Sequence, residues 1–369
     1  MRRATTAKFS IGASVGARQG GDKYALLPGA PHPEVSEQVT AALGRRNLSR
    51  ITDSYSDAPA GGHPPIGTTL AIRAVHENSR SPVHERDEWE GSGRVNGLDG
   101  FLDIARAAVA EGARLLASTP AGKIAAKSDR DHVTELDVEI QMVVQEFLAR
   151  HTPEIGFLGE EANPAPDLSE QSRWWTLDPI DGTSNFVHGL PLCAVSLALV
   201  EHGRSVLGVV NAPFLDLEYH ATLDAGASVN DAPMTASTVT RLSDAVISLG
   251  DYAVGAGAAR KNRERLAITA ALAERVERVR MFGSAALDLV WVAEGRTDGC
   301  VMLSNKPWDT AAGALIAAES GALVTDTDGS PHTVGSKHTI AAAPGLSAEL
   351  LDLVREARQV ARQNKPFPR

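Results

Sequence analysis

The chain has 369 residues, of which 43 % are hydrophobic and 22 % are charged, as in ordinary soluble globular proteins. Its formal net charge of −10 at pH 7 argues against a nucleic-acid-binding protein, because such proteins usually carry a basic excess. No apolar run approaches the roughly 18–20 residues that a membrane-spanning helix needs, so no membrane partner is expected. The two cysteines, Cys193 and Cys300, lie far apart, and the eleven histidines show no zinc-ligand spacing. We therefore expect a cytoplasmic protein with two free thiols.

The first 97 residues differ from the rest in composition. They are rich in Gly, Pro, Ser, Arg and His and show no sustained apolar periodicity, apart from a short helix predicted at 34–43. The opening 21 residues contain no acidic side chain, a composition shared by organelle transit peptides and by short basic leaders. We favour the basic leader, and we expect residues 1–97 to form a poorly ordered N-terminal extension.

From Leu98 onward the sequence predicts mixed helices and strands. Apolar residues spaced three and four apart predict helices, and short runs rich in β-branched residues predict strands. Helices are expected at 98–118, 138–150, 284–294, 310–320 and 348–361, and strands at 155–158, 174–177, 194–200, 205–210, 218–221, 276–281 and 299–303. Several consecutive strands in the middle favour layered helices and sheets over an alternating barrel.

Acidic residues in this region gather in tight clusters, most of them where an apolar segment ends. Carboxylates that reach one edge of a sheet from different segments can form a single site. The clusters are the segment 131–137, the pair Glu160-Glu161, the pair Asp178 and Asp181, and Asp309 after Trp308.

The segment 178–184, with the sequence DPIDGTS, predicts a site for a cation and a phosphate together. Pro179 is expected to end the preceding strand because it has no N–H donor. A turn can then aim the carboxylates of Asp178 and Asp181 at one point, and Mg²⁺ prefers such oxygen ligands. Gly182 allows close backbone approach, and the next residues can begin a helix whose free N–H groups would hold phosphate oxygens. An ordinary turn would explain either Asp-Pro or Asp-Gly alone, but not the whole string beside the other clusters.

These blocks, in this order and spacing, resemble the inositol monophosphatase family, part of a lithium-sensitive phosphatase superfamily that includes the fructose-1,6-bisphosphatases. The resemblance covers about 98–353 and includes the segment 283–288 (GSAALD) and Trp308-Asp309. Residues 1–96 have no counterpart in the family pattern. The resemblance implies a fold of the α/β (α+β) class, a layered αβαβα sandwich, and a homodimer. Residues 98–232 would form a subdomain with most metal ligands, and residues 233–369 a second subdomain with Asp309.

The resemblance also implies roles for individual residues around two to three Mg²⁺ ions per subunit. The first ion would be held by Glu160, Asp178 and the carbonyl of Ile180, the second by Asp178, Asp181 and Asp309, and a third, weaker one by Glu160. The catalytic residues would be Thr183 and Asp137, which would position and polarise the attacking water, with Glu160 close by. The substrate would be bound by Gly182, Thr183, Ser184, Gly283, Ser284, Ala285 and Met302.

Three other residues near these blocks have open roles. Glu161 is either an outer support of the metal site or a solvated carboxylate. His188 would line the pocket or, in the reading that we favour, have a structural role. Lys127 would fix local water or be a surface lysine.

One position departs from the family pattern. Inositol-preferring members typically place a sugar-binding glutamate seven residues before the aspartate of the Trp-Asp pair, where this chain has Met302. The resemblance implies a Mg²⁺-dependent, lithium-sensitive phosphomonoesterase that acts on inositol monophosphate or a related small polyol phosphate. Histidinol phosphate, fructose 1,6-bisphosphate and adenosine 3',5'-bisphosphate are alternative substrates. A regulatory binding protein on the same fold is the alternative of another class.

Overall fold

The structure is a computed structural model that describes residues 97–128, 131–161 and 171–363. The short helix predicted at 34–43, and all of the predicted N-terminal extension except Gly97, lie outside the described residues. Within the described ranges, none of the helices has the length and apolar character required to cross a membrane.

Two helices form the first layer. Helix α3 (Leu98–Ser118) matches the predicted bounds and buries Ile104, Ala105 and Ala108, whose spacing places them on one face. Helix α4 (Glu135–His151) begins three residues before its predicted start because Thr134 and Asp137 form a capping box ahead of the apolar run. The antiparallel strands β1 (Ile124–Ser128) and β2 (Asp131–Thr134), which the sequence did not predict, lie between the two helices in the chain.

A seven-stranded sheet follows, in which the strands are hydrogen-bonded in chain order from β3 to β9. The pair β3–β4 is parallel and the other neighbours are antiparallel. The strands are β3 (Gly156–Gly159), β4 (Arg173–Asp181), β5 (Ala194–Glu201), β6 (Arg204–Ala212), β7 (Leu217–Thr222), β8 (Ala227–Val229) and β9 (Ala232–Met234). A short helix α5 (Thr183–Val187) follows β4, and the 3₁₀ turn η1 (Pro213–Leu215) follows β6.

The prediction that Pro179 ends the strand was wrong. Strand β4 continues to Asp181, and its pairing with β5 shifts register between Asp178 and Asp181. Pro179 lies inside this irregularity, where a ladder hydrogen bond is interrupted in any case, so its missing N–H donor does not stop the strand. The shift places two carboxylates of one strand, three residues apart, near the same edge.

The second sheet has five strands in the order β11, β10, β12, β14 and β13. Strand β12 matches its prediction, whereas β10, β13, β14 and the long helix α6 were not predicted. The strands are β10 (Val246–Leu249), β11 (Arg278–Arg280), β12 (Gly299–Leu303), β13 (Leu323–Thr325) and β14 (His338–Ala342). The helices are α6 (Ala258–Arg275), α7 (Ala285–Ala293), α8 (Pro307–Glu319) and α9 (Ser347–Gln363), and the 3₁₀ turn η2 (Leu242–Asp244) precedes β10.

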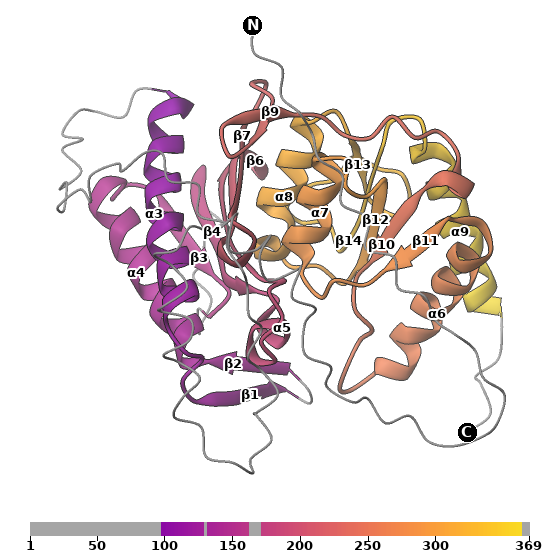
Figure 1. Ribbon diagram of the computed structural model, residues 1–369, viewed down its shortest axis with the longest axis horizontal. Coiled ribbons are helices and arrows are strands. Elements are labelled where there is room, and N and C mark those ends of the chain that lie inside the picture. The colour runs from indigo at the N-terminus through magenta and orange to yellow at the C-terminus, as the bar shows by residue number, and fades with distance from the viewer. Residues whose placement is uncertain (1–96, 129–130, 162–170, 364–369) are drawn as a thin grey trace, which may run out of the picture. The chain divides into compact units, whose positions relative to one another are not determined.

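The described elements form five layers (Figure 1). Helices α3 and α4 cover one face of the seven-stranded sheet, α7 and α8 lie between the two sheets, and α6 and α9 cover the far face of the five-stranded sheet. This arrangement confirms the predicted αβαβα sandwich. The predicted subdomain boundary between residues 232 and 233 stays a prediction; the first sheet ends at Met234 and the second begins at Val246.

Small residues allow α8 to lie close to its neighbours. A Cβ atom on Gly208 of β6 would lie 2.8 Å from the carbonyl oxygen of Ala312, and one on Gly313 would lie 2.7 Å from Cβ of Leu289 in α7. Because real Cβ atoms do not approach other atoms so closely, both positions need glycine. The tight packing fixes α8, and with it the aspartate in its first turn.

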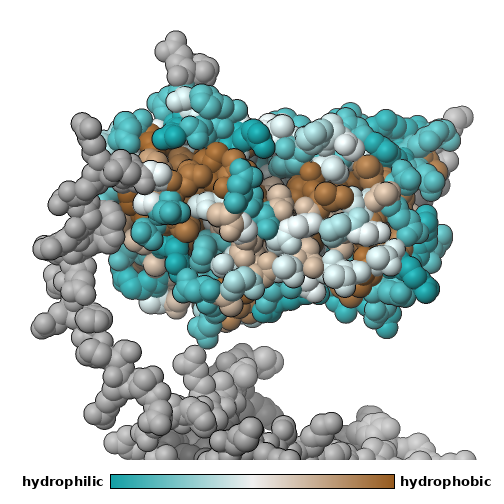
Figure 2. All heavy atoms as spheres, turned by 90° about the horizontal axis from the view of Figure 1, so that it is seen from above, coloured by the Kyte–Doolittle hydropathy of each residue, from teal (hydrophilic) through white to brown (hydrophobic). Residues whose placement is uncertain are grey.

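Both cysteines are free thiols with no solvent exposure. Burial raises the pKa of Cys193 to about 12 and raises the pKa of Cys300 further still. The molecular surface is mixed, and Figure 2 shows hydrophobic patches separated by hydrophilic residues on one face.

Candidate active site

The first two carboxylates of the site come from neighbouring strands. Glu160 directly follows β3, and its N–H donates to the carbonyl oxygen of Leu177 in β4 at 3.1 Å. Because β3 and β4 are parallel, their carboxyl ends lie at one edge of the sheet, where Asp178 is 3 % exposed. Burial raises the pKa of Asp178 well above its usual value, and the nearby Glu160 carboxylate raises it further. The two side chains also share a hydrogen bond.

Asp181 is held by the N-terminus of α7. Its Oδ2 accepts hydrogen bonds from the hydroxyl of Ser284 and from the N–H of Ala286 at 2.7 Å, and its Oδ1 accepts from the N–H of Ala285 at 3.1 Å. Ser284 is also the N-cap of α7, because its Oγ accepts from the N–H of Leu287. Burial raises the pKa of Asp181 to about 6, although the three hydrogen bonds lower it. The fold therefore places a buried carboxylate against a helix N-terminus.

Asp309 lies in the first turn of α8, where its Oδ2 accepts from the N–H of Lys306 at 2.7 Å. Burial, together with the charges of Asp181 and Glu160, raises the pKa of Asp309 to about 7 against the opposing effects of Lys306. The charge of Asp309 raises the pKa of Asp178, and the charges of Asp181 and Glu160 raise the pKa of Asp309. Asp309 therefore lies within electrostatic range of the other three carboxylates. The structure thus brings together four acidic residues that span 149 positions of the sequence (309 − 160).

Asp137 and Thr183 meet beside this cluster. The Thr183 hydroxyl lies 3.2 Å from Oδ1 of Asp137 and 2.9 Å from the carbonyl oxygen of Ile180, and it can donate its single hydrogen to either. Asp137 has no solvent exposure, and its Oδ2 accepts from both the N–H and the hydroxyl of Thr134, at 2.8 and 2.5 Å. These bonds fix the carboxylate that faces Thr183.

The backbone of Gly182, Thr183 and Ser184, which was predicted to hold phosphate oxygens and is called the cradle below, begins with a residue in the left-handed conformation. Gly182 has φ of 89°, and a Cβ there would lie 2.7 Å from the carbonyl oxygen of Leu192, so no other residue fits without strain. Helix α5 then begins at Thr183, as predicted, and its first N–H groups have no intrahelical partners. Ser184 is exposed on this helix.

Asn185, which the sequence reasoning missed, links this cradle to the second half of the chain. Its Nδ2 donates to the carbonyl oxygens of Leu192 and Phe282, both at 2.7 Å. Gly283 follows with φ of 72°, and a Cβ there would lie 3.1 Å from Nδ2 of Asn185. An asparagine in the first turn of a short helix, just after the DPIDGT string, was the available signal.

A cavity of about 180 Å³ opens beside Asp309. Four of the predicted substrate-binding residues line it, namely Gly283, Ser284, Ala285 and Met302. Gly182, Thr183 and Ser184 do not line this cavity and belong to the cradle before it. Asp251 and Asp288 also line the cavity, and neither was predicted as a site residue. Asp288 lies in the GSAALD segment that the sequence reasoning quoted, whereas Asp251 follows β10, a strand that it missed.

The donor set fits a hard divalent cation. It consists of carboxylate and carbonyl oxygens, and burial and mutual repulsion raise the pKa of three of its carboxyl groups, which a cation would offset. Among the described residues, however, no three Asp, Glu, His or Cys side chains already converge on one point as a preformed metal centre would. The carboxylates are held instead by the backbone and hydroxyl donors described above.

Of the residues with open roles, two have structural partners. Nδ1 of His188 lies 2.8 Å from the carbonyl oxygen of Ser184, one turn earlier, and the ring is exposed. The N–H of Glu161 donates to Oε1 of Gln141 at 2.9 Å, which connects the chain after β3 to α4. The side chain of Lys127 lies outside the described part of the structure.

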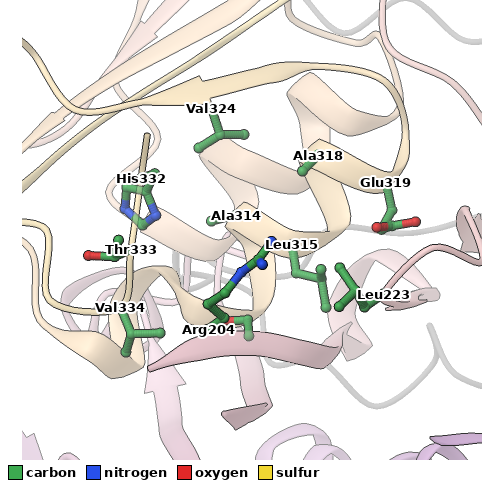
Figure 3. A pocket seen from close by; sticks show the side chains of 11 residues that line it. Arg204, Leu223, Ala314, Leu315, Ala318, Glu319, Val324, His332, Thr333 and Val334 are labelled. Carbon is green, nitrogen blue, oxygen red and sulfur yellow. The ribbon is translucent and has the colours of Figure 1, made fainter. Parts of the chain in front are cut away.

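A second cavity, of about 160 Å³, lies along α8 beyond the candidate site (Figure 3). Arg204 and Leu315 are among the residues that line it, and none of the predicted site residues does. Glu319 at its rim accepts hydrogen bonds from the N–H groups of Asp224 and Gly226, at 3.0 and 2.9 Å, and so closes a turn of the first sheet. Its described lining thus offers no cluster of carboxylates.

Comparison with known proteins identifies the family. A model described as the inositol monophosphatase family matches residues 98–360. The chain belongs to the inositol monophosphatase family. The match begins at the first residue of α3, so the family domain coincides with the sandwich described above.

Relatives from several bacteria support this assignment. A Thermotoga maritima protein named fructose-1,6-bisphosphatase/inositol-1-monophosphatase is 37 % identical over 227 residues, which are 62 % of this chain and 84 % of the relative. A Mycobacterium tuberculosis protein named probable inositol 1-monophosphatase ImpA is 35 % identical over 230 residues, 62 % of this chain and 83 % of its own length. A Pasteurella multocida protein named Nus factor SuhB is 34 % identical over 229 residues, 62 % and 84 % of the two chains.

Solved structures of the inositol monophosphatase family have the same fold. The Thermotoga maritima IMPase structure superposes with a TM-score of 0.65 at 32 % identity and covers 71 % of this chain and 99 % of its own. As an inositol monophosphatase family member, this chain is a phosphoric monoester hydrolase of a metal-dependent family that acts on small phosphorylated substrates.

Proposed function

We propose that this chain is a Mg²⁺-dependent phosphomonoesterase in which water attacks the phosphorus of a small polyol phosphate. The observation that carries the proposal is the group of four acidic residues, Glu160, Asp178, Asp181 and Asp309, which lie within electrostatic range of one another at the edge of the first sheet. Carboxylates so close together repel one another unless a cation joins them or protons neutralise them.

The residues that would hold Mg²⁺ are these four carboxylates and the carbonyl of Ile180, in sites for two to three ions. When bound, Mg²⁺ would neutralise the carboxylates, offset the negative charge of the phosphate and stabilise the charge that develops during displacement. Asp181 would keep its orientation through its hydrogen bonds to α7, so that it does not have to be reoriented when the site fills.

Thr183 and Asp137 are suited to position the attacking water. The Thr183 hydroxyl has lone pairs that can accept a hydrogen bond from water, while its own hydrogen is directed to Asp137 or to Ile180. A proton that leaves the water can therefore pass through the hydroxyl to the Asp137 carboxylate. Thr134 holds that carboxylate still, so the oxygen of the water is fixed relative to the cradle. Glu160 would lie close to the attacking water, as the family resemblance implies.

The phosphate would bind to the N–H groups of Gly182, Thr183 and Ser184 at the start of α5, where backbone donors lack intrahelical partners. The alcohol part of the substrate would enter the cavity lined by Gly283, Ser284, Ala285 and Met302. Met302 is 4 % exposed and offers no oxygen acceptor for a hydroxyl, so the proposal does not require strict inositol specificity.

A regulatory binding role is the second candidate, and the relatives named Nus factor SuhB are the observation that favours it. The complete set of acidic residues at the site supports enzyme activity as the primary role, because a pure scaffold has no need for four buried or half-buried carboxylates. Inhibition by lithium, a homodimeric state and a cytoplasmic location are further parts of the proposal and rest on family membership.

Phosphate release measures the proposed function directly. The full chain would be assayed with inositol 1-phosphate, glycerol 2-phosphate, histidinol phosphate, fructose 1,6-bisphosphate and adenosine 3',5'-bisphosphate, with Mg²⁺ and with EDTA. We expect release with Mg²⁺ alone and inhibition by lithium. Absence of release from every compound, with a correctly melting protein, would leave the binding role as the better account.

A further inference from the structure

The turn between β12 and α8 forms one wall of the cavity beside Asp309. The four consecutive residues 302–305 all line this cavity. The turn leads directly into the first turn of α8, where Asp309 lies. The wall that has Met302 in place of a family glutamate therefore carries an amide side chain, that of Asn305, three residues later.

The backbone of this turn is held in an uncommon conformation. Ser304 has φ of 75°, in the left-handed region that residues with a Cβ atom rarely adopt. The N–H groups of Ser304 and Asn305 both donate to the carbonyl oxygen of Lys337, at 2.8 and 2.9 Å, just before β14. A strained residue persists only where its surroundings fix it, as they do at many ligand sites. The turn thus sets the position of Asn305 against β14.

Hydrogen bonds also fix the direction in which the amide of Asn305 faces. Its Nδ2 donates to Oγ1 of Thr339 in β14, which in turn lies 2.9 Å from Nε2 of His332. Because the Thr339 hydroxyl accepts from the amide, its own hydrogen is available for the imidazole. Burial lowers the pKa of His332, so the ring is neutral at pH 7 and its Nε2 can accept. Thr339 has no solvent exposure, so these bonds do not compete with water.

The other end of the amide is an acceptor that faces the cavity. Within the described part of the chain, Oδ1 of Asn305 has no hydrogen-bond partner, and it is not one of the unpaired side-chain oxygens that are sealed from solvent. Asn305 is 6 % exposed and lines the cavity, so this oxygen is accessible from there. Oδ1 of Asp288, in the same lining, is sealed and cannot make such a contact.

We propose that Asn305 selects the alcohol part of the substrate, with its Oδ1 accepting a hydrogen bond from a hydroxyl group, and that Thr339 is a positioning residue for this amide. A hydroxyl donates one hydrogen, which the amide oxygen can accept, while Met302 packs against the carbon chain. A methyl group in the same place would leave Oδ1 without a partner, which is unfavourable. The inference rests on the proposed phosphatase function and assigns a specificity residue to it.

The test compares phosphate esters in which a methyl group replaces the hydroxyl. The full chain is assayed with Mg²⁺ on pairs of equal length, namely 2-hydroxyethyl and propyl phosphate, 3-hydroxypropyl and butyl phosphate, and 4-hydroxybutyl and pentyl phosphate. The series of lengths ensures that the reach to Asn305 does not decide the result. We expect kcat/KM to favour the hydroxyl compound by about fivefold in the best pair, as for one neutral hydrogen bond. The preference should appear mainly in KM, because the contact is remote from the phosphorus.

Four variants locate the preference. Asn305→Leu keeps the approximate shape of the side chain and removes Oδ1, so the ratio of the two kcat/KM values should fall about fivefold. Thr339→Val removes the acceptor of Nδ2 and frees the amide to rotate, so the ratio should fall about threefold. Thr339→Ser keeps the hydroxyl and should restore the ratio. Thr238→Val, at an exposed position, should leave the ratio unchanged and is the control.

The outcomes separate the inference from the proposed function. The ratio of two substrates does not depend on the folded fraction of the enzyme, so it remains interpretable if a buried substitution lowers the melting temperature. Equal hydrolysis of both compounds of every pair by the wild type, or an unchanged ratio in Asn305→Leu, would overturn the assignment of Asn305 while the phosphatase function stands. An unchanged ratio in Thr339→Val alone would overturn the positioning role of Thr339. If neither these compounds nor inositol 1-phosphate release phosphate with Mg²⁺, the proposed function falls as well.

Discussion

Ser284 donates its hydroxyl hydrogen to Oδ2 of Asp181 across 103 positions of sequence, and its Oγ also caps helix α7. One side chain thus ends the loop before α7 and orients a carboxylate at the end of β4. The contact joins the first sheet to the helix layer between the two sheets, so the geometry of the candidate site depends on both sheets being in place.

Ser284→Ala should weaken both functions of this side chain. Loss of an N-cap costs about 1 kcal/mol in the free energy of unfolding, and the loss of a hydrogen bond to a carboxylate adds about 1.5–3 kcal/mol. Asp181 should also bind Mg²⁺ with a less defined orientation, so the Mg²⁺ concentration for half-maximal phosphatase activity should rise. Denaturant unfolding and Mg²⁺ titrations would measure both effects. Ser243→Ala, at an exposed serine of η2, should change neither and is the matched control.

Asp178→Asn and Asp309→Asn should each abolish most phosphatase activity, because one charge is removed from the oxygen set that would hold Mg²⁺. We expect kcat to fall by about 10²-fold or more, as for the loss of one electrostatic stabiliser of the transition state. The metal-free variants should melt no lower than the wild type, since a repelling carboxylate has been removed. Wild-type turnover with an unchanged Mg²⁺ requirement in either variant would show that the metal assignment is mistaken.

The metal-free protein should lose stability as the pH rises through the range 6–7. Asp181 and Asp309 have folded-state pKa values of about 6 and about 7, above the ordinary 3.8, so the folded state binds protons more tightly than the unfolded state. The contribution of these two groups to the free energy of unfolding is fully present below the unfolded-state pKa, and it is lost as the pH rises through the folded-state pKa. Mg²⁺ should therefore raise the melting temperature more at pH 8 than at pH 5.5.

A difference measurement isolates this effect from other titrating groups. Burial lowers the pKa of His220, His332 and His338, and these groups act on stability in the opposite direction over the same range. They are the same in the wild type and in Asp309→Asn. Melting curves of both proteins in EDTA at pH 5.5 and 8 should show a smaller loss of stability in the variant. Equal losses would contradict the assignment of a raised pKa to Asp309.

Met302→Glu should raise kcat/KM for inositol 1-phosphate relative to glycerol 2-phosphate, by about 1 kcal/mol for one added hydrogen bond to a sugar hydroxyl. In the wild type we expect inositol 1-phosphate to be preferred by no more than about 100-fold, because an apolar contact discriminates weakly. Met302→Leu keeps the wall apolar and should leave the ratio unchanged. Steady-state kinetics on both substrates would decide, and strict inositol specificity in the wild type would show that another residue supplies the hydroxyl contact.

Removal of residues 1–93 should leave melting and phosphatase activity nearly unchanged. The sequence of this segment shows no periodic apolar face, and the family match begins only at residue 98, where α3 starts. Thermal unfolding and phosphate release of the shortened chain would measure the effect. Aggregation, or loss of a cooperative transition, would show that the segment stabilises the sandwich.

Strong periodicity made some elements predictable, and its absence hid others. Helix α3 was predicted with its bounds because a broad apolar face repeats over 21 residues. Helix α6 was missed because its sequence is highly charged and only Arg265, Ile268 and Leu272 are buried. Strand β10 has four residues, too few for a clear pattern.

In the candidate site, too, residues with a local sequence signal were predicted, and residues that only the fold brings together were not predicted from local patterns. The DPIDGT string indicated Asp178, Asp181 and the start of α5 directly, because its turn and helix signals are local. The proximity of Asp137 to Thr183 was inferred through the family resemblance, since 46 positions separate them and no local rule joins them. Asp251 was missed together with its strand, and the place of Asp288 in the wall of the cavity depends on three-dimensional packing that a sequence does not display.

The two buried thiols can be used to measure local unfolding of the layers that cover them. Cys193 belongs to the core between α3, α4 and the first sheet, whereas Cys300 lies in β12 and belongs to the core that α7 and α8 form between the two sheets. A thiol reagent can reach each sulfur only after the surrounding layer has opened, so the two labelling rates measure separate opening equilibria. If the sheets open independently, denaturant will accelerate the two reactions to different extents. If α8 couples them, both cysteines will be labelled with the same free energy of opening.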